Sequence, residues 1–91
     1  MLVARRFLLS GRVQGVGFRW YTREAAAVEN LAGWVRNLPD GRVEALVQGE
    51  RESVDRFGRQ MARGPRGARV DDVETYDEVP GESSAGFEIR G

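Results

Sequence analysis

Residues 11–19 read Gly-Arg-Val-Gln-Gly-Val-Gly-Phe-Arg, and the apolar pattern of the chain changes period across them. Over residues 3–13 most odd positions are apolar, which predicts a strand with one buried face. From about residue 19 to 31, apolar side chains recur every three or four positions, which predicts a helix. Gly15 and Gly17 interrupt both patterns, so we expect a loop between strand and helix. The predicted helical stripe consists of Tyr21, Ala25, Val28 and Leu31.

The remaining sequence completes a split βαβ pattern. Residues 34–38 and 42–48 predict a hairpin, because the Pro39-Asp40-Gly41 segment between them has the composition of a turn. Further elements are expected as a helix at about 52–62 with Val54, Phe57 and Met61 on one stripe, an edge strand at 69–79 and a short strand around Phe87 and Ile89. This order predicts one α+β domain over residues 1–91. We expect a ferredoxin-like sandwich with two helices on one face of an antiparallel sheet, plus the short C-terminal strand.

The glycine-rich loop is a candidate anion site. It precedes a predicted helix, whose first amides lack internal acceptors and whose dipole favours negative charge. Gly15 and Gly17 allow consecutive amides to converge on phosphate oxygens, and Arg19 adds a planar, permanently charged donor. A glycine-rich turn with a surface arginine is the alternative interpretation of the same residues.

Other phosphate-binding loops do not match this stretch. A Walker A loop requires a Gly-Lys dipeptide, and the chain contains no lysine. The dinucleotide-binding fingerprint requires a third glycine at the position of Trp20. A phosphatase loop with a thiolate nucleophile requires a cysteine, which is also absent.

The composition restricts the chemistry further. Without cysteine or histidine, the chain has no thiolate nucleophile, no imidazole base and no zinc site built on those ligands. Any chemistry of the chain must therefore use arginine, asparagine, carboxylates, hydroxyls and the backbone. Fourteen basic and fourteen acidic residues give a formal net charge of zero. The protein as a whole is therefore not expected to be attracted to nucleic acid or membranes, although a local positive site is compatible with this balance. Only three apolar residues follow Arg5 and Arg6 before a polar break, too few for a signal peptide, so a cytoplasmic location is expected.

Asn37 is a second candidate site residue. An asparagine just before a turn commonly has a capping or turn role. Its amide group can also hold a water molecule while leaving one lone pair of that water free to attack. We assign the nearby Asp40 to the turn itself.

The segments 11–19 and 33–41 together resemble the acylphosphatase family. The first matches its Gly-x-Val-Gln-Gly-Val-x-Phe-Arg loop, and the second its Gly-Trp-Val-x-Asn segment running into an Asp-Gly turn. Chain length, element order and the closing residues 87–90 also fit this family. The resemblance implies a monomeric, metal-free hydrolase of acyl phosphates.

The resemblance also implies roles for individual residues. Arg19 corresponds to the catalytic, phosphate-binding arginine, and Asn37 to the residue that orients the attacking water. The backbone amides of Gly15, Val16, Gly17, Phe18 and Arg19 correspond to the phosphate cradle.

Two other functions fit the same element order. RNA-recognition domains stack bases on aromatic side chains of their central strands, but residues 42–48 contain no aromatic residue. The second alternative function is that of a module that binds phosphate or a similar anion without turning it over. Such domains usually belong to larger maturation proteins, and this chain ends at Gly91, which we take to favour the enzyme.

The other conspicuous residues receive structural interpretations. We expect Trp20, Tyr21 and Trp34 to pack in or beside the core. The arginines of residues 63–69 are expected on a solvated loop, and residues 80–86 are expected to form a mobile loop.

Overall fold

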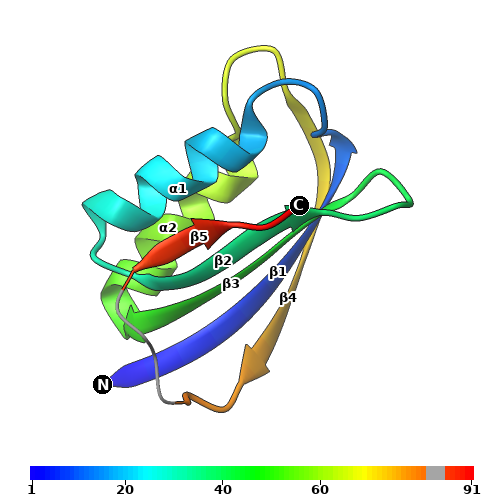
Figure 1. Cartoon of the computed structure of the whole chain (residues 1–91). Helices are drawn as coiled ribbons and strands as arrows, with labels where there is room; N and C mark the ends of the chain where they lie inside the picture. The colour runs from blue at the N-terminus through cyan, green and yellow to red at the C-terminus, as the bar shows by residue number, and fades with distance from the viewer. Residues whose placement is uncertain (82–85) are drawn as a thin grey trace.

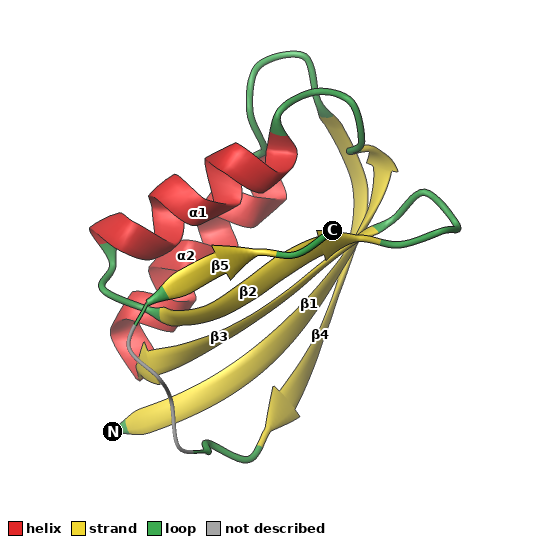
Figure 2. Cartoon of the chain, viewed as in Figure 1, coloured by secondary structure: helices red, strands yellow, loops and turns green. Residues whose placement is uncertain are grey.

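The computed structural model describes residues 1–81 and 86–91 of the chain (Figure 1). Its elements follow the predicted order, and their bounds are β1 Leu2–Arg12, α1 Phe18–Val28, β2 Ala32–Asn37, β3 Val43–Glu50, α2 Arg51–Arg63, β4 Arg69–Glu78 and β5 Phe87–Ile89. Both helices lie on the same face of one sheet, as Figure 2 shows, so the fold is the expected ferredoxin-like α+β sandwich.

The strands of the sheet follow the order β4-β1-β3-β2-β5. The first four are paired antiparallel, and β4 lies at one edge, as predicted. The terminal strand β5 pairs parallel with β2 at the other edge, which makes the sheet mixed. The sequence had indicated this strand without its direction, because that direction depends on how residues beyond β4 return across the sheet.

The core lies between the sheet and the helices, and the predicted periods account for its residues from β1 and α2. In β1, Phe7, Leu9 and the following Val13 join the core as the two-residue period predicted, although Ala4 and Leu8 at intervening positions are also buried. In α2, Val54, Phe57 and Met61 are fully buried, which confirms the predicted stripe. The rings of Phe7 and Phe57 meet edge to face, with centroids 5.4 Å apart, so β1 and α2 are joined at the centre of the core.

The predicted stripe of α1 is partly wrong. The helix buries Phe18, Thr22 and Ala26, which lie four residues apart, and Val28 on the other side is 81% exposed. Helical packing begins at Phe18 rather than at Tyr21, and this rotates the buried face. Thr22 tolerates burial because its hydroxyl donates to the Phe18 carbonyl, 2.8 Å away.

The rotation of α1 also corrects the expectation for Trp20. Its side chain is 58% exposed, and the Arg23 guanidinium stacks on it, 3.8 Å from the ring centroid. Tyr21 packs against the core as expected. Trp34 is half-buried on the opposite face of the sheet, between Arg36 and Arg90.

The mobile loop predicted for residues 80–86 falls mostly on residues 82–85, outside the described residues. Within the described residues, no helix is long and apolar enough to cross a membrane.

We predict that Phe57→Ala destabilises the protein by about 3–5 kcal/mol, because it removes a fully buried ring and leaves a cavity. Val28→Ala is the matched control in the other helix. Its exposed side chain should change the free energy of unfolding by less than about 0.5 kcal/mol. Urea unfolding followed by circular dichroism measures both, and equal losses would contradict this description of the core.

Candidate functional site

The glycine-rich loop joins the end of β1 to the start of α1 at one end of the molecule (Figure 1). Gly15 and Gly17 both have left-handed backbone conformations, with φ of +74° and +78°. A β-carbon on either glycine would meet no atom within 4 Å, so the requirement for glycine comes from the backbone and not from crowding. The predicted bend between strand and helix is therefore present.

The backbone amides of residues 15–19, which we call the amide loop, have no acceptor in the part of the chain that the structure describes. The first helical bond runs from the Tyr21 amide to the Gly17 carbonyl. Gly17 is the N-cap of α1 and offers no side-chain cap. Several amide donors without acceptors thus lie at the positive end of the helix dipole, a combination that suits an anion.

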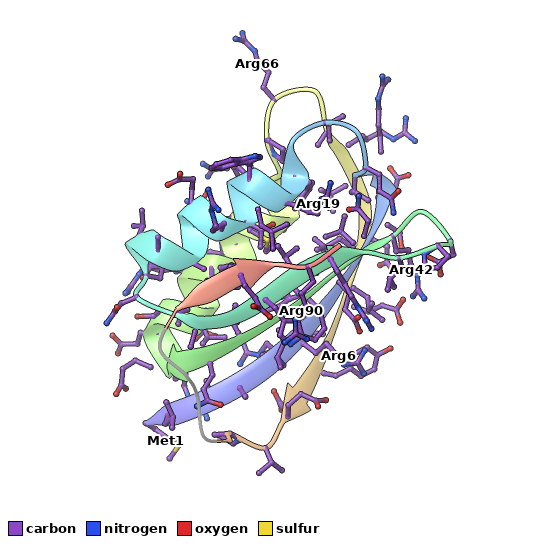
Figure 3. The ribbon with its side chains drawn as sticks, viewed as in Figure 1. Met1, Arg6, Arg19, Arg42, Arg66 and Arg90 are labelled. Atoms are coloured by element: carbon purple, nitrogen blue, oxygen red, sulfur yellow. The ribbon has the colours of Figure 1, made fainter. Side chains whose placement is uncertain are left out.

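Arg19 lies on the first turn of α1 and is half-buried. Its side chain extends from the helix toward the ends of the strands, beside the amide loop (Figure 3). Arg19 and the loop donors therefore lie at the same end of the fold.

Asn37 is the last residue of β2 and pairs with Val43 of β3. It is half-buried, and its side-chain amide has no hydrogen-bond partner among the residues that the structure describes. The hairpin turn beyond it is closed by a bond from the Leu38 amide to the Arg42 carbonyl, 2.8 Å long. Asn37 is therefore held at the rim of a short, well-bonded turn while its own amide group stays available.

Asp40 belongs to that turn, which confirms its assignment. One carboxylate oxygen accepts from the Arg42 amide at 3.0 Å, and the other from Arg42 Nε at 2.9 Å. The bond from the Arg42 amide, followed by the contact with the Arg42 guanidinium, lowers the pKa of Asp40 below its usual value. A carboxylate that is engaged on both oxygens and holds its proton weakly is a poor general base.

Gln14 ties the two segments together, a role that the sequence analysis missed. Its side-chain Nε2 donates to the Leu38 carbonyl at 2.8 Å and to the Arg42 carbonyl at 3.0 Å. These two carbonyls flank the turn that follows Asn37. The motif contained Gln14, but nothing in the sequence indicates which distant carbonyls it reaches.

Charged residues are unevenly distributed over the molecule, although the formal net charge of the chain is zero. The end of the molecule that carries the amide loop, formed by residues 11–19, 37–43 and 63–72, holds six arginines and three aspartates. Arg42 pairs with Asp40 and Arg69 pairs with Asp71. The arginines there that form no ion pair within the described residues are Arg12, Arg19, Arg63 and Arg66. This end, which we call the basic end, is the local positive site that the net charge had left possible (Figure 3).

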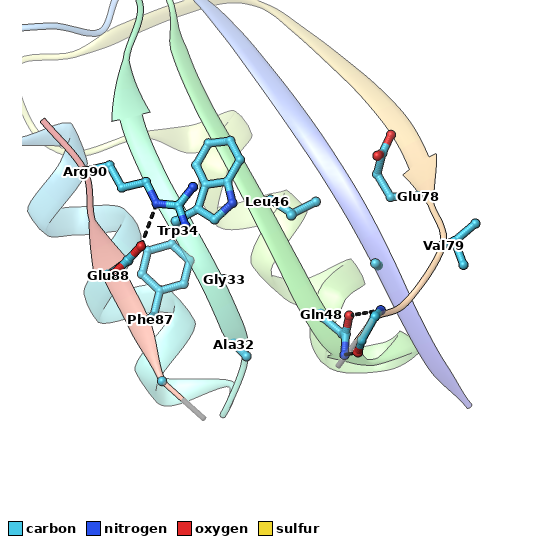
Figure 4. A pocket seen from close by; sticks show the side chains of 13 residues that line it. Ala32, Gly33, Trp34, Leu46, Gln48, Glu78, Val79, Phe87, Glu88 and Arg90 are labelled. Atoms are coloured by element: carbon cyan, nitrogen blue, oxygen red, sulfur yellow. Dashed lines mark hydrogen bonds and ion pairs between the residues drawn. The ribbon is translucent and has the colours of Figure 1, made fainter. Parts of the chain in front are cut away.

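A hollow of about 480 Å³ on the open face of the sheet lies away from this site (Figure 4). Its lining includes Trp34, Leu46, Gln48, Val79 and Arg90. A second hollow lies near the end of α1. Neither includes Asn37 or a residue of the amide loop, so we place the candidate site by its donors rather than by cavity size.

Comparisons with known proteins point to one family. A family model described as Acylphosphatase matches residues 5–89. The acylphosphatase of Koribacter versatilis (strain Ellin345) is 49% identical over 87 residues, which cover 96% of the chain and 79% of that relative. The acylphosphatase of Nitrosococcus oceani is 53% identical, covering 99% of the chain and all of the relative. The crystal structure of acylphosphatase from Bacillus subtilis superposes with a TM-score of 0.94 at 36% identity, covering both chains completely.

We predict that Gly17→Ala weakens the binding of inorganic phosphate about tenfold, because alanine disfavours the left-handed conformation by roughly 1–2 kcal/mol and the loop amides turn away. Gly67→Ala is the matched control. Gly67 also has positive φ, at +89°, with open space around it, but lies outside the amide loop.

Both glycine variants should lose similar stability in urea, and only Gly17→Ala should lose phosphate affinity in isothermal titration. Parallel losses of affinity in both variants would show that the effect is general rather than local to the amide loop.

Proposed function

The chain belongs to the acylphosphatase family, and we propose that Arg19, Asn37 and the amide loop carry the reaction of this family here. The chain is a hydrolase that cleaves the carboxyl–phosphate bond of acyl phosphates to a carboxylate and inorganic phosphate. The observation that supports our assignment of the site is the set of unengaged amides at residues 15–19 on the same helix start as Arg19.

The reaction suits a chain without histidine or cysteine. An acyl phosphate is a mixed anhydride, and its leaving group is a carboxylate, a weak base that departs without being protonated. No general acid is therefore needed. Attack of water on phosphorus passes through a loose, in-line transition state with charge spread over the equatorial oxygens, so positioning and charge stabilisation do most of the catalytic work.

We assign charge stabilisation to the amide loop and Arg19. Converging amides and a planar guanidinium can donate to several phosphate oxygens at once. Donors that are already in place need no reorganisation as charge develops, and removing one such donor typically costs on the order of 3 kcal/mol in the barrier. Arg19 also attracts the substrate before reaction, so its removal should affect binding as well.

We assign the attacking water to Asn37. Its free amide group can accept from the water and donate to it, leaving a lone pair directed at phosphorus. Asp40 is unsuited to take the proton, because both of its oxygens are engaged by Arg42 and its pKa is lowered. In this proposal the proton passes to a phosphate oxygen of the substrate.

The family assignment does not favour a non-catalytic anion-binding module, because curated acylphosphatases match nearly the whole chain. Our proposal further includes action in the cytoplasm as a monomer, without metal, cofactor or nucleic acid. The physiological acyl group is expected to be recognised loosely, since the donors described above all address the phosphate.

We predict different kinetic losses for the two site residues. Arg19→Ala should lose both phosphate affinity and turnover. Asn37→Ala should keep phosphate affinity within about twofold and lose mainly kcat, by about a hundredfold, since only the water is misplaced. Hydrolysis of benzoyl phosphate in the presence of EDTA, with inorganic phosphate as competitor, separates these effects.

Asn30→Gly is the control for the asparagine variant. Asn30 has a φ of +57°, which glycine adopts without strain, and should keep full activity. An Asn37→Ala enzyme with the parent kcat would rule out the water-positioning role.

We also predict that attraction of substrate depends on salt. Substrate dianions should be drawn to the basic end, so kcat/KM on benzoyl phosphate should fall about three- to tenfold between low salt and 0.5 M sodium chloride. Arg66→Glu should lower kcat/KM at low salt and weaken this dependence.

Arg51→Glu is the charge-matched control. Arg51 starts α2 and Arg63 ends it, so Arg51 is separated from the basic end by about 18 Å of helix. Equal effects of the two charge reversals would indicate that overall charge, and not its position, controls the rate.

A further inference from the structure

Gln14 forms the one direct side-chain link from the strand-to-helix loop to the β2–β3 hairpin among the hydrogen bonds of the described residues. Its Nε2 lies 2.8 Å from the Leu38 carbonyl oxygen and 3.0 Å from that of Arg42. Both partners are acceptors, so the amide must present its nitrogen to the hairpin, and both N–H groups are used. The link is half-buried, which limits competition from water.

The two accepting carbonyls lie on opposite sides of the turn. The Leu38 carbonyl also accepts from the Gly41 amide at 3.1 Å, and the Arg42 carbonyl also accepts from the Leu38 amide at 2.8 Å. Gln14 therefore adds a bridge across the mouth of a turn that is already closed by its own backbone. The bridge fixes the orientation of the turn relative to the loop, which the internal bonds of the turn cannot do.

The position of Gln14 in the chain gives this bridge a consequence for the reaction. Its backbone immediately precedes Gly15, where the amide loop begins, and Leu38 immediately follows Asn37. The phosphate cradle and the water-orienting amide thus lie on separate elements, and the Gln14 side chain is a short connection between them.

We propose that Gln14 is a positioning residue that holds Asn37 at the correct distance from the phosphate in the amide loop. This role rests on the proposed function of Asn37. Gln14 touches neither water nor phosphate. It acts through the backbone of the hairpin, and in-line attack is sensitive to displacements of about 1 Å at the nucleophile.

The test replaces Gln14 with methionine, which has similar length and no donor to offer the two carbonyls. Gln14→Met should lower kcat on benzoyl phosphate about tenfold and change the inhibition constant of inorganic phosphate by less than about twofold. Gln14→Asn keeps the amide but is one methylene shorter, and it should give the same pattern if Gln14→Met does not fold.

Gln48→Met is the matched control. Gln48 also makes two side-chain bonds to distant backbone, donating to the Gly81 carbonyl at 2.8 Å and accepting from the Gly81 amide at 2.9 Å, in a more exposed position. It lies in β3 but lines the hollows remote from the amide loop. Its replacement removes a comparable bridge and should leave kcat unchanged. If both variants lower kcat equally, a general loss of rigidity explains the effect and the proposal is overturned.

A double-mutant cycle with Asn37→Ala tests the coupling. Once Asn37 is removed, Gln14→Met should lower the residual kcat by less than about twofold, because there is no water-orienting group left to misplace. A full tenfold loss in the Asn37→Ala background would overturn the proposal, as would a phosphate inhibition constant that rises in parallel with the loss of kcat. If Gln14→Met has the activity of the parent while Asn37→Ala is inactive, the proposed role of Gln14 is overturned and the proposed role of Asn37 stands. Parent activity in Asn37→Ala would overturn both.

Discussion

A group of backbone donors that the protein leaves unengaged is the feature on which this site depends. Left-handed glycines at positions 15 and 17 turn the chain from β1 into α1, so that the amides of residues 15–19 face no acceptor among the described residues. In the absence of ligand, water must satisfy these amides, and a phosphate group can replace that water with several bonds at once. In the proposed site, the helix dipole and Arg19 add to these donors, so backbone geometry contributes first and one side chain second.

The sheet places the second half of the site beside this loop. Leu9 of β1 pairs with Val43, and Val43 pairs with Asn37, so β2 ends and β3 begins level with Leu9, while β1 continues to Arg12 before the amide loop. The hairpin beyond them has little freedom, because its own backbone, Asp40 and the Gln14 side chain all bond to it. A rigid hairpin suits the water-orienting role that we propose for Asn37, since positioning is most of what this reaction requires of a protein.

The charges follow the same division of the molecule. Arginines gather at the end with the amide loop, while acidic residues predominate in the rest of the chain, and the formal net charge is zero. A chain of this kind has no long-range field at large distance, yet it presents positive potential within about a Debye length of the site.

The sequence by itself determined the element order, the α+β sandwich, the core positions of β1 and α2, and the bend at Gly15 and Gly17. These features follow from local periods and from glycine chemistry, which act within a few residues of each other. The tertiary structure alone decided the rotation of α1 that exposes Trp20 and buries Thr22, the parallel direction of β5, and the contact of Gln14 with the carbonyls of Leu38 and Arg42. Each of these three features depends on which distant segment of the chain lies opposite the residue in space. The type of the residue does not indicate that segment, because only the assembled sheet brings the two together.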